Sequence, residues 1–254
     1  MKQLSFINRR YKGVFAIAAS VLAMCVASSA NAQCNTALIG RVIPTGGGLA
    51  SDLFGISVDI EGDRAVIGAP GAQQSGVPSG GAYVFERVGG QWVQQFKLGR
   101  VDWADGDDFG NSVAMNGNTI VVGVPRDDDF GNDSGSVYVY TTVFGAWFQQ
   151  AKLLADDGEE DDLFGASVAI DGDTIVVGAH SNDHDGTNSG AAYVYTRSGG
   201  VWTQRTKLSP SDAQPFDHFG AEVFIKGDRI AVGATGLSPG GSDGGAVYIC
   251  ILVL

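Results

Sequence analysis

The sequence predicts an all-β fold made of four copies of one antiparallel unit. A Phe-Gly pair recurs at a constant spacing of 55 residues. Turn residues separate runs of β-branched residues, and no segment has the 3.6-residue apolar period of an amphipathic helix. Units of four short strands, repeated at a fixed spacing, are typical of a β-propeller, in which each unit is one blade. The repeated pairs are Phe54-Gly55, Phe109-Gly110, Phe164-Gly165 and Phe219-Gly220.

The first 32 residues have the pattern of a secretory signal peptide. Basic residues precede an apolar run over 14–27, and a small-residue cleavage pattern follows at Ala30-Asn31-Ala32. The run is too short to cross a bilayer as a helix, which takes about 20 residues. We expect cleavage after Ala32 and a secreted, periplasmic or cell-surface location. The general secretion route is expected, and Arg9-Arg10 leaves a twin-arginine route as the alternative.

The charge of the chain restricts its partners. The formal net charge is −12, and loss of the four basic and no acidic residues of the signal peptide changes it to −16. A strongly negative field repels phosphate backbones and anionic lipids and attracts cations. We therefore expect no nucleic-acid partner and no membrane span. The expected partner is an unknown protein or glycan that is cationic or bridged by a metal ion.

The third repeat shows the expected strands most clearly. The runs SVAI and IVVGA flank the turn Asp171-Gly172-Asp173, which predicts a tight hairpin. A third strand over 191–196 turns at Gly199-Gly200 into a fourth over 201–208. We expect repeats over residues 50–104, 105–159, 160–214 and 215–254, the last incomplete.

Aromatic residues and lysines also recur in phase with the Phe-Gly pairs. Because they repeat, we expect them to pack between strands and blades rather than to form one special site. They are Tyr83, Tyr138, Tyr193 and Tyr248, Trp92, Trp147 and Trp202, and Lys97, Lys152 and Lys207.

A second motif follows each Phe-Gly pair at a constant distance: Gly68-Ala69-Pro70, Gly123-Val124-Pro125, Gly178-Ala179-His180 and Gly233-Ala234-Thr235. Together the two motifs resemble the FG-GAP repeat of integrin α-subunit propellers and of many secreted bacterial proteins. The resemblance implies a propeller whose Phe packs between neighbouring blades and whose Gly lets the chain bend. For function it implies adhesion, ligand binding or scaffolding alike.

Integrin-like repeats bind calcium in a long Asp-rich loop between their first and second strands. Here that connection is a short turn such as Asp171-Gly172-Asp173. Calcium takes six to eight oxygens, and a hairpin turn cannot wrap them round one ion. We expect the family's calcium loop to be absent from this place and the acids there to be turn formers.

The last repeat stops after its third strand, so a closed ring needs one more strand. Residues 36–43 have the phase, length and apolar content of a fourth strand. We expect the N-terminal segment 33–49 to complete the last blade, which would hide an edge prone to aggregation. The alternative is that the chain is part of a larger propeller, since integrin-type propellers have seven blades, or pairs as a homodimer to make one.

After signal cleavage Cys34 and Cys250 remain. Tyr195 is expected to face Trp202, and the same shift places Cys250 opposite Ala37, three residues from Cys34. We therefore predict a Cys34 to Cys250 disulfide, which would contribute about 4 to 5 kcal/mol in the loop-entropy model.

Most acidic residues are expected on one side of the propeller. In a four-stranded meander the 2–3 loops and the linkers between blades share one side, and the tight turns share the other. We call the first side the loop face. It receives 20 of the 28 acidic residues, against only Arg100 and Arg126 as bases. The simple interpretation is a solvated surface that keeps the protein soluble.

The sharper hypothesis is that the loop face binds Ca²⁺. Two 2–3 loops offer alternating oxygen ligands around a glycine, although both lack the bidentate Glu of an EF-hand loop. The candidate ligands are Asp127, Asp129 and Asp133 around Gly131, and Asp183, Asp185 and Asn188 around Gly186.

The sequence favours a binding or adhesion module over an enzyme. The three histidines have no HExxH spacing, and no Gly-x-Ser-x-Gly motif is present. We expect a secreted interaction module with an acidic loop face, assisted by calcium. The alternatives are a purely structural cell-surface or matrix component and a hydrolase that uses a non-repeated acid such as Glu159 or Glu160.

Overall fold

The computed structural model describes residues 41–45, 48–74, 76–100, 102, 104–236 and 244–253 of the 254-residue chain. The chain divides into two compact units, Met1–Val42 and Ile43–Leu254, and every described strand lies in the second. The expected signal peptide, Cys34 and most of the proposed closing strand lie outside the described residues. No helix among the described residues has the length and hydropathy needed to cross a membrane.

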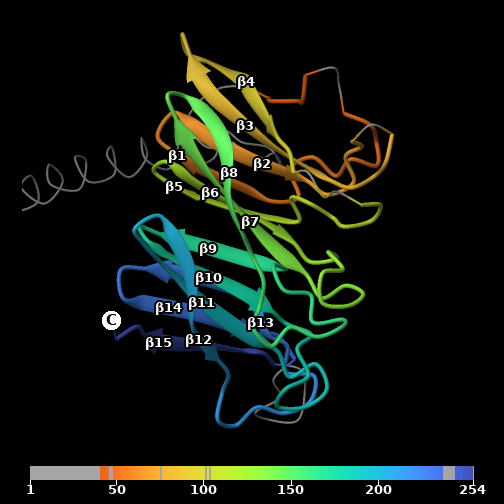
Figure 1. The fold of residues 1–254 in the computed structure, drawn as a ribbon, viewed down its shortest axis with the longest axis vertical. Helices are drawn as coiled ribbons and strands as arrows, with labels where there is room; N and C mark the ends of the chain where they lie inside the picture. Colours follow the sequence, from red (N-terminus) through yellow and green to blue (C-terminus); the bar gives the residue numbers. More distant parts are fainter. Residues whose placement is uncertain are drawn as a thin grey trace, which may run out of the picture. The chain divides into compact units, whose positions relative to one another are not determined.

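The described strands form four antiparallel sheets that follow one another along the chain, in the colours from orange to blue in Figure 1. Each sheet corresponds to one predicted blade, and its strands lie in sequence order, which confirms the all-β prediction. Blade one has β1 (Val58–Glu61), β2 (Arg64–Ala69), β3 (Gly81–Val88) and β4 (Gln91–Leu98); blade two has β5 (Ser112–Asn116), β6 (Thr119–Val124), β7 (Ser136–Val143) and β8 (Ala146–Leu153). Blade three has β9 (Ser167–Asp171), β10 (Thr174–Ala179), β11 (Ala191–Ser198) and β12 (Val201–Leu208); blade four has β13 (Phe219–Lys226), β14 (Arg229–Ala234) and β15 (Ala246–Ile251).

The hairpin between β11 and β12 corrects one expected pairing. Tyr195 lies opposite Gln204, and Trp202 lies opposite Arg197. The reason is the turn: Gly199 and Gly200 both have positive φ, so they form a two-residue turn and pairing starts at the residues next to them. A β-bulge after Val194 shifts the register once more. The expected pairing of Tyr195 with Trp202 was therefore wrong, and it no longer supports placing Cys250 opposite Ala37. Ala37 and Cys34 lie outside the described residues, so the disulfide stays a prediction.

Consecutive blades pack face to face. We call the sheet face that contacts the next blade along the chain the forward face, and the face that contacts the preceding blade the backward face. Between blades two and three, Val121 and Val139 of the forward face are buried in one cluster with Val168 and Ile175 of the backward face. Residues in the same phase form the other two cores. Burial of each such side chain stabilises the fold by about 1.5–3 kcal/mol.

The repeated Phe of blades two, three and four belongs to these interfaces. Phe164 is buried, and its ring lies edge-on to Tyr193 and Tyr195, with centroids 5.3 and 6.0 Å away. Phe109 and Phe219 occupy the same place in blades two and four and are also buried. Edge-to-face aromatic pairs of this kind add stability beyond the area that they bury.

Hydrogen bonds join consecutive blades at both ends of the strands. The Ser112 hydroxyl donates to the Gly165 carbonyl at 2.8 Å, and the Asn116 side-chain oxygen accepts from the Gly172 N–H at 3.0 Å. The backbones approach so closely that a Cβ on Gly123 would lie under 3.0 Å from the carbonyl oxygen of Gly165. Only glycine fits at such a contact, which explains the Gly of the second motif.

Blade four has three strands among the described residues, and β15 is its last. Leu208 and Ile230 line a cavity of about 290 Å³ beside this strand, together with Cys250. Residues 41–45 and 48–49, the described part of the proposed closing segment, are in no strand. Completion of blade four by residues 36–43 stays a prediction.

Candidate functional site: the loop face

The 2–3 loops and the linkers between blades lie against each other. The Phe164 N–H donates to the Ser134 carbonyl at 3.1 Å, which joins the linker before blade three to the 2–3 loop of blade two. Equivalent bonds run from Phe109 to Ser79 and from Phe219 to Ser189. Figure 1 shows these long connections toward the right of the view and the tight turns toward the left. The loop face is therefore a continuous set of neighbouring loops.

Four of the buried acids of the loop face share one position in the repeat and are not surface charges. Each stands two residues before a repeated Phe and accepts the backbone N–H three residues earlier. Asp162, for example, accepts from the Glu159 N–H at 2.9 Å. Their constant spacing was the signal that these acids are structural and shape the linker. The four are Asp52, Asp107, Asp162 and Asp217.

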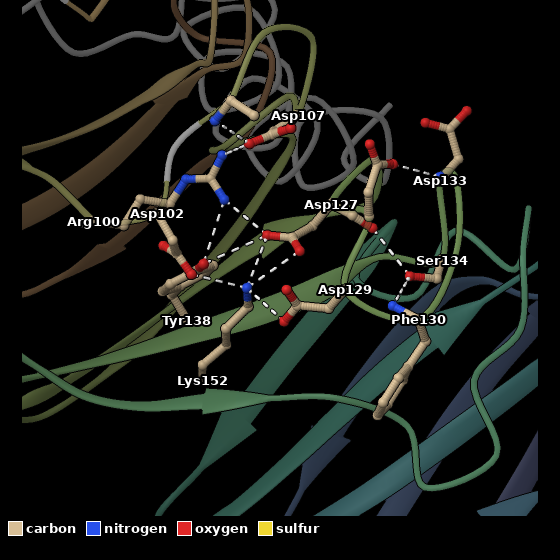
Figure 2. Close-up of polar contacts among 12 residues, drawn as sticks. Arg100, Asp102, Asp107, Asp127, Asp129, Phe130, Asp133, Ser134, Tyr138 and Lys152 are labelled. Carbon is tan, nitrogen blue, oxygen red and sulfur yellow. Dashed lines mark hydrogen bonds and ion pairs between the residues drawn. The ribbon is translucent and has the colours of Figure 1, made fainter.

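Blade two carries a buried ion pair that Figure 2 shows at the centre of its loops. The Arg100 guanidinium lies between Asp107 and Asp127 and donates to both carboxylates, to Asp127 at 2.8 Å. All three side chains are buried. The charges stabilise one another because none of them is left unpaired in a low-dielectric environment.

Lys152, from the fourth strand of the same blade, closes the cluster from the other side (Figure 2). Its ammonium lies 2.7 Å from Asp129, 3.0 Å from Asp102 and 3.2 Å from Asp127, and 5.1 Å from the centroid of the Tyr138 ring. Burial lowers the pKa of Lys152, but the hydrogen bonds that Lys152 donates to Asp129, Tyr138 and Asp102 outweigh burial and raise it above its usual value. Burial also raises the pKa of Tyr138 to about 12. The lysine therefore stays charged and the tyrosine neutral.

Lys152 holds two of the three candidate ligands of blade two, Asp127 and Asp129. Asp127 is buried and satisfied by Arg100 and Lys152, and Asp129 also pairs with Lys152. Asp133 has a positive φ of 53°, and its N–H donates to Asp128 at 2.9 Å. A cation at Asp127 would have to compete with two positive side chains.

The corresponding loop of blade three is more open to solvent. Asp183 and Asp185 are exposed, and the carboxylate of Asp183 accepts the Asn188 N–H at 2.6 Å. Asn182 takes the place of Asp127, and its amide donates to Asp162 at 2.9 Å. The carboxylates of Asp183 and Asp185 are in no ion pair in the described part of the chain.

Beside this loop the surface has a cavity of about 320 Å³ lined by Asp157, Glu159, Asp183, His184 and Lys207, with Asn182. The Lys207 ammonium lies 2.8 Å from Asp157. Burial raises the pKa of Asp157, but the hydrogen bonds from Lys207 and Tyr193 outweigh burial and lower it below its usual value. Three carboxylates, an imidazole and an ammonium here are suited to binding a polar or cationic group.

His180, His218 and Cys250 do not line this cavity. His180 and His218 face each other with ring centroids 5.9 Å apart, and Cys250 is a free, partly buried thiol of β15 in the described structure. Among the described residues, no three His, Cys, Asp or Glu side chains are grouped so as to hold a metal ion.

Comparison with known families identifies the repeat. The FG-GAP repeat model matches residues 42–85, 92–140, 147–195 and 202–250. The chain belongs to the FG-GAP repeat family. The first match begins before blade one, and each of the other three begins in the fourth strand of the preceding blade. Every match ends in the third strand of its own blade. A search of curated proteins finds no match to the chain.

Membership of the family sets the broad class of the protein. FG-GAP propellers are typically binding or structural modules rather than catalysts, and they are typical of extracellular proteins. The FG-GAP repeats suggest an interaction or adhesion module. The fold alone does not name a ligand.

Proposed function

We propose that this protein is a secreted binding or adhesion module that presents its loop face to a cationic or metal-bridged partner. The observation that supports the proposal is the cluster of exposed carboxylates on this face, which remains when the buried acids are not counted. A dense negative field attracts cationic groups and speeds their encounter with the surface. The exposed acids are Asp102, Asp105, Asp128, Asp129, Asp156, Asp157, Glu159, Glu160, Asp161, Asp183, Asp185 and Asp212.

The linker between blades two and three is the centre of the proposed surface. It carries Asp156, Asp157, Glu159, Glu160 and Asp161, all exposed. The 2–3 loop of blade two lies against it on one side, because a Cβ on Gly131 would lie 3.2 Å from the Glu160 Cβ. The cavity beside blade three lies on the other side. A ligand bound here would contact acids from three neighbouring loops.

The test uses a fluorescein-labelled Lys-rich decapeptide as the cationic probe and measures anisotropy at low and high salt. The triple variant Asp156→Asn, Asp157→Asn, Glu159→Gln is expected to weaken binding about tenfold, or ~1.4 kcal/mol. The control removes three acids from the tight turns on the other side, Asp63→Asn, Asp173→Asn, Asp228→Asn. Equal loss in both variants would show a net-charge effect and contradict the proposed surface.

Two further outcomes test the other two function classes, the first in the same binding experiment and the second in a turnover assay. A purely structural component would show no saturable binding at any salt concentration. A hydrolase would show turnover of a substrate that is lost when Glu159 or Glu160 is neutralised. Either result would replace the proposed binding function.

We also propose that Ca²⁺ assists binding through the 2–3 loop of blade three. Asp183 and Asp185 are in no ion pair in the described part of the chain, and with Asn188 they would supply oxygens there, whereas Arg100 and Lys152 neutralise Asp127 in blade two. The remaining oxygens would come from backbone carbonyls and water, which calcium accepts. Affinity is expected to be modest because few carboxylates contribute.

Calorimetric titration with CaCl₂, and the melting temperature in CaCl₂ against EDTA, test this role. Calcium at ten times its dissociation constant stabilises the protein by about 1.4 kcal/mol. The variant Asp183→Asn, Asp185→Asn is expected to lose this gain, and Asp63→Asn, Asp173→Asn to keep it. Absence of heat and of any rise in melting temperature at millimolar calcium would remove calcium from the proposal.

A further inference from the structure

The outermost sheet faces of blades one and four each carry exposed apolar side chains. On the forward face of blade four, Phe224 is 62% exposed, and Val247 and Ile249 are each 67% exposed. On the backward face of blade one, Val58 is 65% exposed and Ile60 is 62% exposed. Side chains of this size are rarely left open on a regular sheet, and a contiguous group of them marks an interaction surface.

The repeat shows what each of these faces is built to contact. The residues 55 positions before Phe224, Val247 and Ile249 are Ala169, Ala192 and Val194, which are buried against blade four. The residues 55 positions after Val58 and Ile60 are Val113 and Met115, which are buried against blade one. The exposed forward face of blade four therefore matches the exposed backward face of blade one.

The two faces do not cover each other within the chain, because both are exposed in the same structure. We propose that a second copy of this chain covers them: the forward face of blade four packs on the backward face of blade one of the other copy, and the reciprocal contact closes a ring of eight blades. Such a head-to-tail contact closes into a ring only if its rotation allows it. Eight blades lie within the usual range for propellers.

The polar rim of this contact differs from the rims inside the chain. Glu222 occupies the repeat position of the serines that donate a hydrogen bond to the next blade. Lys226 occupies the repeat position of Glu61, Asn116 and Asp171, whose side chains accept a backbone N–H of the next blade. Neither can repeat the internal bond. The contact between copies rests on apolar packing, so it is weaker than the internal interfaces and depends on concentration.

A close backbone approach is part of the same prediction. A Cβ on Gly233 meets nothing nearer than 3.7 Å within the chain, whereas a Cβ on Gly68, Gly123 or Gly178 would collide with the next blade. In the assembled ring Gly233 would meet the backbone of the other copy. Gly233→Ala is therefore expected to leave the single chain intact and to block assembly.

The experiment is sedimentation velocity of the full chain over a wide range of concentration. We expect the mass to rise from one chain to two. Ile249→Asp, Val58→Asp and Gly233→Ala should each stay monomeric, with a dissociation constant raised about 100-fold or more and a monomer melting temperature close to that of the native chain. The control is Phe144→Asp, because Phe144 is fully exposed at a tight turn, and this variant should assemble normally.

Mixing two defective variants tests the head-to-tail geometry. Ile249→Asp keeps an intact blade one and Val58→Asp keeps an intact blade four. Their mixture should form a heterodimer through that one intact contact, weaker than the native ring, although neither variant assembles alone. A native chain that stays monomeric at every concentration would overturn the proposal, as would filaments of unlimited length. Failure of the mixture to pair at any concentration would also overturn it, because the one intact contact should still form.

Discussion

The Arg100 guanidinium lies 2.8 Å from the Asp127 carboxylate, and both side chains are buried. Blade three has Ala155 and Asn182 in the same positions, also buried, and the Asn182 amide donates to Asp162. One site in the repeat is thus filled by an ion pair in blade two and by a neutral pair in blade three.

This substitution within the repeat predicts the outcome of a double-mutant cycle. Asp127→Asn alone is expected to cost about 1–3 kcal/mol, because the buried Arg100 loses one of its two carboxylate partners and keeps only Asp107. The double variant Arg100→Ala, Asp127→Asn should recover most of that loss, since the new amide can donate to Asp107 as Asn182 donates to Asp162. Urea denaturation measures both. Equal destabilisation by the single and double variants would contradict the coupling.

The buried acid before each Phe-Gly pair is expected to stabilise its linker. Asp162→Ala removes the acceptor of the Glu159 N–H and should cost about 1–2 kcal/mol. Glu160→Ala, at an exposed position of the same linker, should change stability by less than about 0.5 kcal/mol. Thermal unfolding compares the two, and equal effects would mean that the hydrogen bond of Asp162 is not what matters.

Glycine in the second motif is expected to be required by space and not by backbone angle. Gly123→Ala would push a Cβ into the Gly165 carbonyl and should cost about 1–3 kcal/mol. Gly99→Ala is the matched control, because a Cβ there meets nothing within 4 Å and its φ is not positive. Denaturation midpoints give the comparison. A stable Gly123→Ala protein would show that the blades are farther apart than described.

His180 is expected to make stability fall below neutral pH. Burial lowers the pKa of His180, and the nearby His218 lowers it further. As pH falls below about 6.5, His180 takes up a proton in the unfolded chain before it does so in the folded protein. Proton uptake therefore favours the unfolded chain, and stability that is present above about pH 6.5 is lost as pH falls toward the pKa of His180 in the folded protein. The added slope is at most about 1.4 kcal/mol per pH unit, the value for one proton.

The difference between the native protein and His180→Asn isolates this effect from other titrating groups. Burial raises the pKa of Asp108 and Asp162, which act in the opposite direction in both proteins. His184→Asn, at an exposed position of the same loop, should keep the native pH dependence. Melting temperatures between pH 5 and 7.5 measure it, and parallel curves for native and His180→Asn proteins would contradict the prediction.

The sequence predicted the blades well because their signals repeat. Phe164, Gly165 and the turn at Gly172 have counterparts at a constant spacing, so a chance pattern is excluded. Strand pairing near Tyr195 was missed because a β-bulge leaves no separate signal in the sequence. The register of the fourth strand therefore had to come from the structure.

The loop face was predicted only in part. Its location follows from the meander, and the exposed Asp183 and Asp185 lie where polar loops were expected. The burial of Asp127 and Asp162 depends on Arg100 and on backbone N–H groups brought close by the fold. Composition alone cannot tell a solvated carboxylate from one that bonds inside the protein.

The constant phase of the blade interfaces has a consequence for changes in repeat number. The forward face of blade one has Val66 and Val84 where that of blade two has Val121 and Val139. Deletion of 55 consecutive residues would bring together a forward face and a backward face that are already complementary. Duplication of the same stretch would add one more interface of the same kind. Genes for chains of this kind can therefore gain or lose a blade in one step without having to invent a new interface.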